Sequence, residues 1–349
     1  MIFVLISDPA VEYNVHYCTL PCVFFKLVNI FQARELIIFL LVRVFSTMRI
    51  SHLVLLFSLC VFSCQASQDN RAILNNIERT NPAIEYDVEN SASSSIMSWL
   101  SWSPSTLEKV REAERNILDY VETDSVGFFV NIGLVRGEEC RVWTRKFGPD
   151  LPGQVPLVMV HGMGAGLALF VMNYDSLAAN RTVYALDLPG FGRSSRISFP
   201  TDPQEVESQY TLIMEKWRTV LGIEKMNLLG HSFGGYLTGL YTLQYPQHIK
   251  LCILADPWGM TDKPSDWKPR RKIPDWAKAL GSVLMNLNIK PLWGLRASGP
   301  AGPWLVRRLR PDIMRKFEDL LGAGNTTLIA DYLYHCNAQD PTGEAAFNR

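Results

Sequence analysis

Short apolar runs alternate with longer amphipathic segments from residue 105 onward. Five runs predict buried strands, at 141–147, 156–160, 183–188, 226–229 and 250–254. A helix is predicted at 203–221 because apolar side chains recur there at three- and four-residue spacing, namely Val206, Tyr210, Ile213, Trp217 and Val220. Further helices are predicted at 105–121 and 234–244. Strands that alternate with helices indicate an α/β fold with a mostly parallel, doubly wound sheet.

The first 67 residues have a different pattern. Apolar runs at 36–45 and 53–62 are each shorter than the roughly 20 residues that span a bilayer as a helix, so neither predicts a transmembrane helix. From Met48 a basic start, an apolar middle and small residues follow one another, as in a signal peptide. If translation begins at Met1, the same segment is an internal hydrophobic hairpin or a membrane anchor, and a misassigned start is the third interpretation. Residues 1–67 are therefore left out of the fold prediction.

A polar stretch rich in Ser, Asn and Glu at 67–95 predicts a linker. Trp99 and Trp102 follow it, just before the predicted helix at 105–121. Indole rings settle at the headgroup level of a bilayer, so these two side chains predict a membrane contact. Packing of both onto the folded domain is an equal alternative. The predicted organisation is thus a linker with an anchor segment at 68–104 and one domain at 105–349.

Composition limits the classes of function. Of the 349 residues 48% are hydrophobic and 19% are charged, which is enough apolar material for one large core and unlike a disordered chain. The net charge of zero argues against a nucleic-acid partner. Four of the seven cysteines lie in the first 64 residues, and the three that follow are widely spaced, which is unlike a disulfide framework. No cluster of cysteine and histidine suggests a metal site. We therefore expect no metal ion at the site.

A five-residue motif joins the predicted strand at 226–229 to the predicted helix at 234–244. It reads Gly230-His231-Ser232-Phe233-Gly234. This fits the pattern G-x-S-x-G, in which a serine occupies a strained strand-to-helix turn and the flanking glycines avoid collisions with neighbouring backbone. The turn lifts the hydroxyl out of the edge of the sheet. We therefore predict that Ser232 is a catalytic nucleophile, with a buried structural serine as the alternative.

A glycine-rich loop, His161-Gly-Met-Gly-Ala-Gly166, follows the predicted strand at 156–160. Such a loop can turn a backbone N–H toward a reacting carbonyl, and an oxyanion hole needs two donors of this kind. We expect them to be the N–H of Phe233 and that of Met163 or Gly164. The glycines alone also fit a loop that cradles phosphate, but neither a dinucleotide G-x-G-x-x-G nor a Walker lysine is present.

A third motif, Asp187-Leu-Pro-Gly-Phe-Gly-Arg-Ser-Ser195, lies at the end of the predicted strand at 183–188. Its proline and glycines force a sharp exit from the sheet. We expect Asp187 and Arg193 to hold this loop together and to have no catalytic role. His161 and His231 are interpreted as structural too, because each lies in a tight loop and the neighbour of an elbow serine points away from its hydroxyl.

These motifs, with Asp256-Pro-Trp-Gly259 and Tyr334-His-Cys-Asn-Ala-Gln339, resemble one α/β-hydrolase subfamily. It includes an N-acylphosphatidylethanolamine lysophospholipase and a lipid-droplet protein that co-activates triglyceride lipase. The resemblance runs from about Trp99 to the last residue. It implies an α/β-hydrolase fold, no cofactor, and a membrane or lipid-droplet location. The co-activator has asparagine where this chain has Ser232, so the serine favours the hydrolase branch.

Residues 260–340 are interpreted as a helical lid. Between Thr261 and Lys316 there are thirteen lysines and arginines against four aspartates, with four interleaved tryptophans: Trp267, Trp276, Trp293 and Trp304. A basic, aromatic segment of this kind fits a lid that meets anionic headgroups. An ordinary solvated helical face with core tryptophans is the alternative.

The acid and the base of a catalytic triad are missing from the prediction. In α/β-hydrolases they follow the serine in the order acid, then histidine. After Ser232 the histidines are His248, just past the elbow helix, and His335, which the resemblance places inside the lid. Asp256 and His335 are therefore kept only as weak candidates. We expect the last strands of the sheet to be missing, which would leave an unpaired edge.

The predicted function is a serine hydrolase of lipid esters or amides, of the lysophospholipase or N-acyl phospholipid lipase type, with acyl transfer to lysophosphatidate as a variant. The alternative is a non-catalytic scaffold or lipase co-activator on lipid droplets. By resemblance, the partners are a phospholipid or lysophospholipid, a membrane or droplet surface, and a lipase or droplet-coat protein. The expected location is the cytoplasmic face of membranes or droplets, with the secretory pathway as the alternative if the segment at Met48 is a signal peptide.

Overall fold

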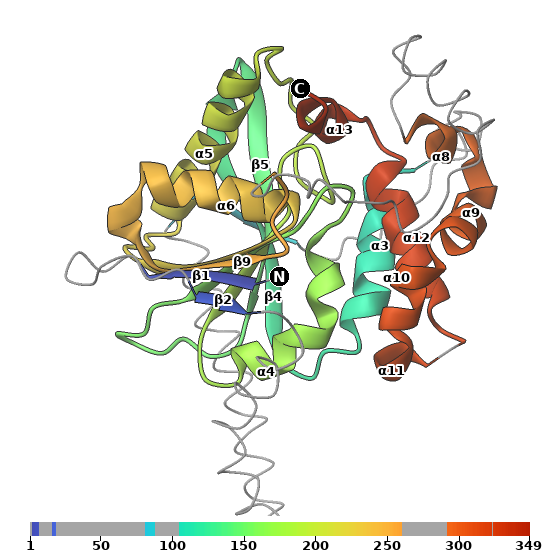
Figure 1. Cartoon of the computed structure of the whole chain (residues 1–349), viewed down its shortest axis with the longest axis horizontal. Helices are drawn as coiled ribbons and strands as arrows, with labels where there is room; N and C mark the ends of the chain where they lie inside the picture. The colour runs from blue at the N-terminus through green and yellow to red at the C-terminus, as the bar shows by residue number, and fades with distance from the viewer. Residues whose placement is uncertain (1, 7–15, 19–80, 88–104, 260–291, 323) are drawn as a thin grey trace, which may run out of the picture.

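The computed structural model describes residues 2–6, 16–18, 81–87, 105–259, 292–322 and 324–349 (Figure 1). These residues form helices around one sheet with the strand order β2-β1-β9-β8-β6-β7-β5-β4-β3. The strands are β1 Ile2–Ile6, β2 His16–Cys18, β3 Ile84–Tyr86, β4 Ser125–Val135, β5 Glu138–Phe147, β6 Leu157–Val160, β7 Val183–Leu186, β8 Met226–His231 and β9 Ile249–Ala255.

Four central strands run parallel to one another. β6 pairs in parallel with β7 and β8, and β8 pairs in parallel with β9. All four residues of β6 are buried, as a strand covered on both faces requires. The five strands predicted from apolar runs correspond to β5, β6, β7, β8 and β9. The predicted α/β class is therefore confirmed, with antiparallel strands added at both edges of the parallel centre.

One edge of the sheet was not foreseen. β4 forms an antiparallel hairpin with β5, and β3 pairs antiparallel with β4. β3 lies inside the stretch that its polar composition predicts to be a linker, so that expectation is wrong for residues 84–86. Three residues between polar neighbours carry almost no pattern, and it is the pairing with Phe128, Phe129 and Val130 of β4 that orders them.

The expected unpaired edge next to β9 is also wrong. β1 pairs antiparallel with β9 over five residues, from Ile2 opposite Ala255 to Ile6 opposite Leu251. β2 then pairs with β1. Helices, and no strand, follow β9 in the described part of the chain. An N-terminal segment therefore pairs with the edge of β9 that was expected to be left unpaired.

Helices cover both faces of the sheet (Figure 1). α5 Pro203–Val220 and α6 Phe233–Gln244 share one apolar core, which contains Trp217 and Tyr241. α3 Leu107–Leu118, η3 Leu167–Asn173, α4 Tyr174–Ala178 and α12 Thr327–Asn337 share a second core, which contains Ile117 and Tyr332. The three helices predicted at 105–121, 203–221 and 234–244 are confirmed as α3, α5 and α6.

The described part of the predicted lid is a run of short helices. They are α8 Trp293–Ala297, η5 Gly299–Ala301, α9 Gly302–Leu309, α10 Pro311–Lys316, α11 Glu318–Leu321 and α12, and α13 Thr342–Phe347 follows them. A short η4 Pro246–His248 links α6 to β9. Among the residues described, no helix is long and apolar enough to cross a bilayer. The apolar runs at 36–45 and 53–62, together with Trp99, Trp102, Trp267 and Trp276, lie outside the described residues.

Candidate active site

Ser232 lies in the turn between β8 and α6. Its φ of 55° and ψ of −118° lie in a region that residues with a side chain rarely adopt. Three backbone hydrogen bonds hold the turn: Ser232 N–H donates to the Ala255 carbonyl at 3.0 Å, and the Ser232 carbonyl accepts from Tyr236 at 3.1 Å and Trp258 at 3.0 Å. Hydrogen bonds to both β9 and α6 thus hold Ser232 in this strained conformation. A strained serine at a strand-to-helix turn is the geometry of a nucleophile elbow.

The glycines around Ser232 are required by close backbone contacts. A Cβ on Gly230 would lie 2.4 Å from the Gly234 carbonyl oxygen, and one on Gly234 would lie 2.4 Å from that of His161. A Cβ on Gly162 would lie 3.0 Å from Cβ of Ser232. The glycine-rich loop 161–166 therefore packs directly against the elbow.

Two groups of backbone donors lie beside Ser232. Phe233 is the first residue of α6, and the first N–H groups of a helix have no partner within it. Loop 161–166 carries Met163 and Gly164, the latter with a φ of 67°. Because Gly162 of this loop touches Ser232, the loop and the start of α6 flank the same hydroxyl. The arrangement has the components of an oxyanion hole.

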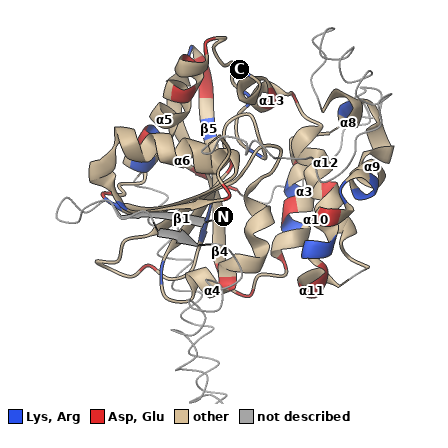
Figure 2. Cartoon of the chain, in the orientation of Figure 1, with Lys and Arg blue, Asp and Glu red and all other residues tan. Residues whose placement is uncertain are grey.

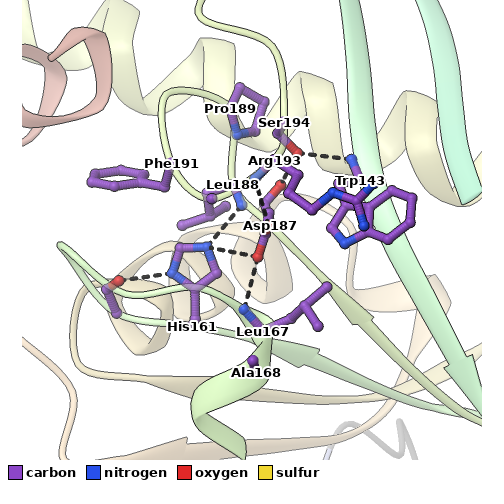
Figure 3. Close-up of polar contacts among 12 residues, drawn as sticks. Trp143, His161, Leu167, Ala168, Asp187, Leu188, Pro189, Phe191, Arg193 and Ser194 are labelled. Atoms are coloured by element: carbon purple, nitrogen blue, oxygen red, sulfur yellow. Dashed lines mark hydrogen bonds and ion pairs between the residues drawn. The ribbon is translucent and has the colours of Figure 1, made fainter. Parts of the chain in front are cut away.

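Asp187 and Arg193 organise the loop after β7 (Figure 3). The fully buried Asp187 carboxylate accepts from the N–H of Leu167 at 2.7 Å and from that of Arg193 at 2.8 Å. Burial raises the pKa of Asp187 to about 6, against the opposing effect of these hydrogen bonds. The carboxylate is thus used in structural bonds, in agreement with the expected role of Asp187.

The Arg193 side chain extends this network to α3 and to Asp87, the residue after β3. Its guanidinium lies 3.5 Å from the centre of the Trp143 ring and pairs with Glu114 at 3.2 Å and Asp87 at 2.7 Å. Glu114 is buried, and burial raises its pKa to about 7. Charged groups this deep in a protein persist only when paired. The network therefore ties loop 187–195 to the helix and strand on either side of residues 88–104.

Three histidines have partners other than Ser232. Nδ1 of His161 lies 2.8 Å from the Gly162 carbonyl, and its Nε2 accepts from Leu188 N–H at 3.0 Å. Burial lowers the pKa of His161 to about 4, so the ring is neutral and both nitrogens are used. His248 Nδ1 lies 2.9 Å from the Glu224 carbonyl, and His335 Nδ1 lies 3.0 Å from the Ser105 hydroxyl. Burial lowers the pKa of His335 to about 4 as well.

The acid and base therefore stay predictions. Asp256 follows β9 with a φ of 49° and is exposed, and Nδ1 of His335 lies beside the Ser105 hydroxyl. His231 lies beside the glycine-rich loop, since a Cβ on Gly162 would be 3.2 Å from its Nδ1. The described residues contain no group of three or more His, Cys, Asp and Glu side chains that could hold a metal ion.

Sequence reasoning missed the end of α12 as part of the site. Asn337 donates from Nδ2 to the Gly164 carbonyl at 2.7 Å, and Gln339 donates from Nε2 to the Gly192 carbonyl at 2.9 Å. Phe347 of α13 packs on Phe233 and Trp258, with ring centres 5.1 and 4.9 Å apart. The motif that contains Asn337 and Gln339 was noted only as part of a resemblance. No local pattern links it to loops more than 140 residues away.

Comparison with known proteins identifies the family. The family described as alpha/beta hydrolase fold matches residues 155–295. The chain is 43% identical over 242 residues to the (Lyso)-N-acylphosphatidylethanolamine lipase of Mus musculus, covering 69% of this chain and 68% of the relative. It is 47% identical over 207 residues to the 1-acylglycerol-3-phosphate O-acyltransferase ABHD5 of Homo sapiens, covering 59% and 58%.

Among solved structures, naproxen esterase of Bacillus subtilis aligns with a TM-score of 0.43 at 18% identity, covering 67% of this chain and 68% of that one. The strand order, the serine turn and the sequence relatives agree. The chain belongs to the α/β-hydrolase fold family.

Proposed function

We propose that the chain is a serine hydrolase of lipid esters or amides with Ser232 as its nucleophile. The observation that carries this proposal is the strained Ser232, held between β8 and α6 and packed against the glycine-rich loop. Ser232 Oγ attacks the substrate carbonyl, and the N–H groups of Phe233 and of Met163 or Gly164 donate to the oxygen that becomes negative. The bond between the carbonyl carbon and the substrate's alcohol or amine then breaks, and that group leaves with the serine proton, so that the acyl group remains on Ser232. Water, or a lysophosphatidate hydroxyl where the acyl group is transferred, attacks this ester and restores the serine hydroxyl.

The relatives support phospholipids or lysophospholipids as the substrate class. One is named for the hydrolysis of (lyso)-N-acylphosphatidylethanolamine and the other for acyl transfer to 1-acylglycerol-3-phosphate. Aromatic side chains beside the elbow offer apolar surface to an acyl chain: Trp258, whose backbone N–H donates to the Ser232 carbonyl, is 50% exposed and packs on Phe347. A serine at position 232 supports hydrolysis over a purely scaffolding role.

The same proposal places the protein at a lipid surface. On α9, Trp304 is 63% exposed and Arg307 and Arg308, one turn further on, are exposed as well, and Trp293 of the neighbouring α8 is 53% exposed. Figure 2 shows basic residues along α8 and α9 at the outer edge of the helical segment. Indole rings and cations together suit an interface that carries anionic headgroups. The cytoplasmic face of a membrane or of a lipid droplet is the location we propose, with a lipase or droplet-coat protein as further partner.

Fluorophosphonate labelling tests the proposed nucleophile. The probe is expected to modify Ser232 of residues 1–349 slowly, because His161, His248 and His335 are bonded to other groups, and Ser232→Ala is expected to abolish the label. Ser208→Ala is the matched control, since Ser208 is an exposed serine of α5. Labelling of the Ser232→Ala protein at the wild-type rate would remove Ser232 from this role.

A further inference from the structure

The end of α12 contacts both loops that border the serine turn. Asn337 is the last residue of the helix, and its Nδ2 donates to the Gly164 carbonyl and to the Leu333 carbonyl, each at 2.7 Å. Two residues later, Gln339 donates to the Gly192 carbonyl at 2.9 Å. One turn of chain thus holds the glycine-rich loop and the loop after β7.

The glycine-rich loop needs such an external contact. Glycine occupies positions 162, 164 and 166, so its backbone has far more conformational freedom than an ordinary loop. Gly164 has a φ of 67°, and a Cβ there would lie 3.1 Å from Oδ1 of Asn337. Asn337 therefore fills the space beside Gly164 and bonds to its carbonyl.

The direction of the loop's N–H groups follows from this contact. A peptide group is planar, so holding a carbonyl oxygen also orients the N–H of the next residue. The peptide that joins Gly164 to Ala165 is held at both ends, by Asn337 at the Gly164 oxygen and by the Gly162 carbonyl, which accepts from Ala165 N–H at 3.3 Å. The Gly164 N–H belongs to the preceding peptide, which is joined to this plane through the φ and ψ of Gly164, so holding the plane restricts the directions in which that N–H can point.

The backbone of Asn337 makes a further contact. Its backbone carbonyl accepts from Nη1 of Arg296 at 3.4 Å, and the same Arg296 nitrogen pairs with the Glu344 carboxylate at 2.8 Å. Glu344 is 2% exposed and also accepts from Leu292 N–H at 2.7 Å. α8, α12 and α13 therefore meet at one ion pair next to Asn337, which holds the backbone at the end of α12.

We propose that Asn337 is a positioning residue for the oxyanion hole, acting through the Gly164 carbonyl. This inference rests on the proposed hydrolase function, which it deepens. In this proposal α12 does not only cover the active site: its last residue, Asn337, completes the geometry that binds the oxyanion. Catalytic efficiency becomes dependent on correct docking of α12.

Two variants of the full chain test the proposal. Asn337→Asp keeps the shape but removes both N–H donors and places a carboxylate against two carbonyl oxygens. Asn337→Ala removes the amide without adding charge and serves if the first variant does not fold. Asn348→Asp is the matched control, because Asn348 is exposed at the end of the chain. A thermal melt of each variant measures any general loss of stability.

Two readouts separate positioning from folding. Hydrogen exchange of a peptide that covers residues 162–167 is expected to rise in both Asn337 variants and to stay at the wild-type level in Asn348→Asp. The maximal rate of fluorophosphonate labelling at Ser232 is expected to fall about tenfold or more, since outright loss of one oxyanion donor costs roughly a hundredfold or more. The probe concentration that gives half of that rate is expected to change less than about twofold, because the hole acts on the tetrahedral state rather than on ground-state binding.

The outcomes are distinguishable. Wild-type exchange and wild-type labelling in both Asn337 variants would overturn the positioning role and leave the proposed function standing. The positioning role would also be overturned if the probe concentration for half-maximal labelling rose while the maximal labelling rate stayed unchanged, since that pattern reports a binding contact. No labelling of the wild-type chain would overturn the proposed function and, with it, any role of Asn337 in an oxyanion hole.

Discussion

Individual residues around Ser232 carry strain that function explains better than stability does. With φ at 55° and ψ at −118°, Ser232 adopts a backbone conformation that glycine reaches far more easily. Bonds from Ala255, Tyr236 and Trp258 impose that conformation. A fold under selection for stability alone has no reason to keep a side chain at this point, whereas a nucleophile must have one.

This strain leads to a prediction on stability. Ser232→Gly is expected to be more stable than Ser232→Ala by about 1 kcal/mol, because relief of roughly 1–3 kcal/mol of strain is partly offset by the greater freedom of glycine in the unfolded chain. Both variants lose the nucleophile, so their difference in stability reports the relief of backbone strain minus the effect of glycine on the unfolded chain. Urea unfolding of the two proteins measures it. A Ser232→Gly protein that is less stable than Ser232→Ala would show that the turn is unstrained.

The sequence predicted the residues whose roles are local. Ser232, Gly230 and Gly234 follow from a turn that needs a strained serine and two positions without Cβ, and Asp187 follows from a loop that bonds to itself. Asn337 was missed because its contact with Gly164 spans 173 residues. Periodicity and turn chemistry describe neighbours along the chain, so a hydrogen bond made by the tertiary fold leaves no trace in them.

Elements of structure follow the same division. β6 to β9 were predicted because buried parallel strands are short, apolar and bounded by turns. β3 was missed because pairing with β4 defines it more than its own pattern does. β1 was missed because residues 1–67 were left out of the fold prediction as a signal or anchor segment, although its five residues are all apolar. The two faces of α9 differ. Val306 is buried and Gly302 approaches the Tyr334 ring, whereas the opposite face exposes Trp304.

The exposed face of α9 predicts binding to anionic vesicles. Replacing both Arg307 and Arg308 with glutamine is expected to weaken flotation with phosphatidylserine vesicles roughly tenfold or more, at about 1 kcal/mol per basic residue near the surface. Trp304→Ala is expected to weaken binding to both phosphatidylserine and neutral vesicles, because the indole contributes apolar contact. Leu212→Ala, an exposed apolar side chain of α5, is the control.

The same flotation assay tests the membrane contact predicted for Trp99 and Trp102, with the double variant Trp99→Ala, Trp102→Ala. Unchanged flotation of every α9 variant alongside a weakened Trp99 and Trp102 variant would assign the lipid contact to residues 88–104. Unchanged flotation of all variants would show that neither segment meets the bilayer.

At the scale of the whole molecule, exposed asparagines report its compartment. Asn180-Arg-Thr182 and Asn325-Thr-Thr327 fit the glycosylation pattern, and both asparagines are exposed. A chain that faces the cytoplasm carries no glycan there, so we expect no mass shift after glycosidase treatment of protein from secreting cells. A shift at either site would favour the signal-peptide interpretation of the segment that begins at Met48.

The rate at which the chain turns over an ester depends on a base that takes the proton of Ser232. In the described residues, His161, His248 and His335 are each bonded to another group. A serine hydroxyl without a positioned base keeps only the catalysis of the oxyanion hole and of binding, roughly a thousandfold over water or somewhat more. We therefore expect weak turnover of a short-chain ester by residues 1–349.

His335→Ala decides whether His335 has a structural role or is the base for Ser232. If His335 serves only to join α12 to α3 through Ser105, its removal is expected to leave the weak turnover within about twofold while lowering the melting temperature, since a buried hydrogen bond contributes roughly 1 kcal/mol. Turnover is followed with p-nitrophenyl butyrate, with Ser232→Ala as the blank. Strong turnover that both Ser232→Ala and His335→Ala abolish would instead make His335 the base. Asp256 would then be the first acid to test, because it follows β9 beside the serine turn.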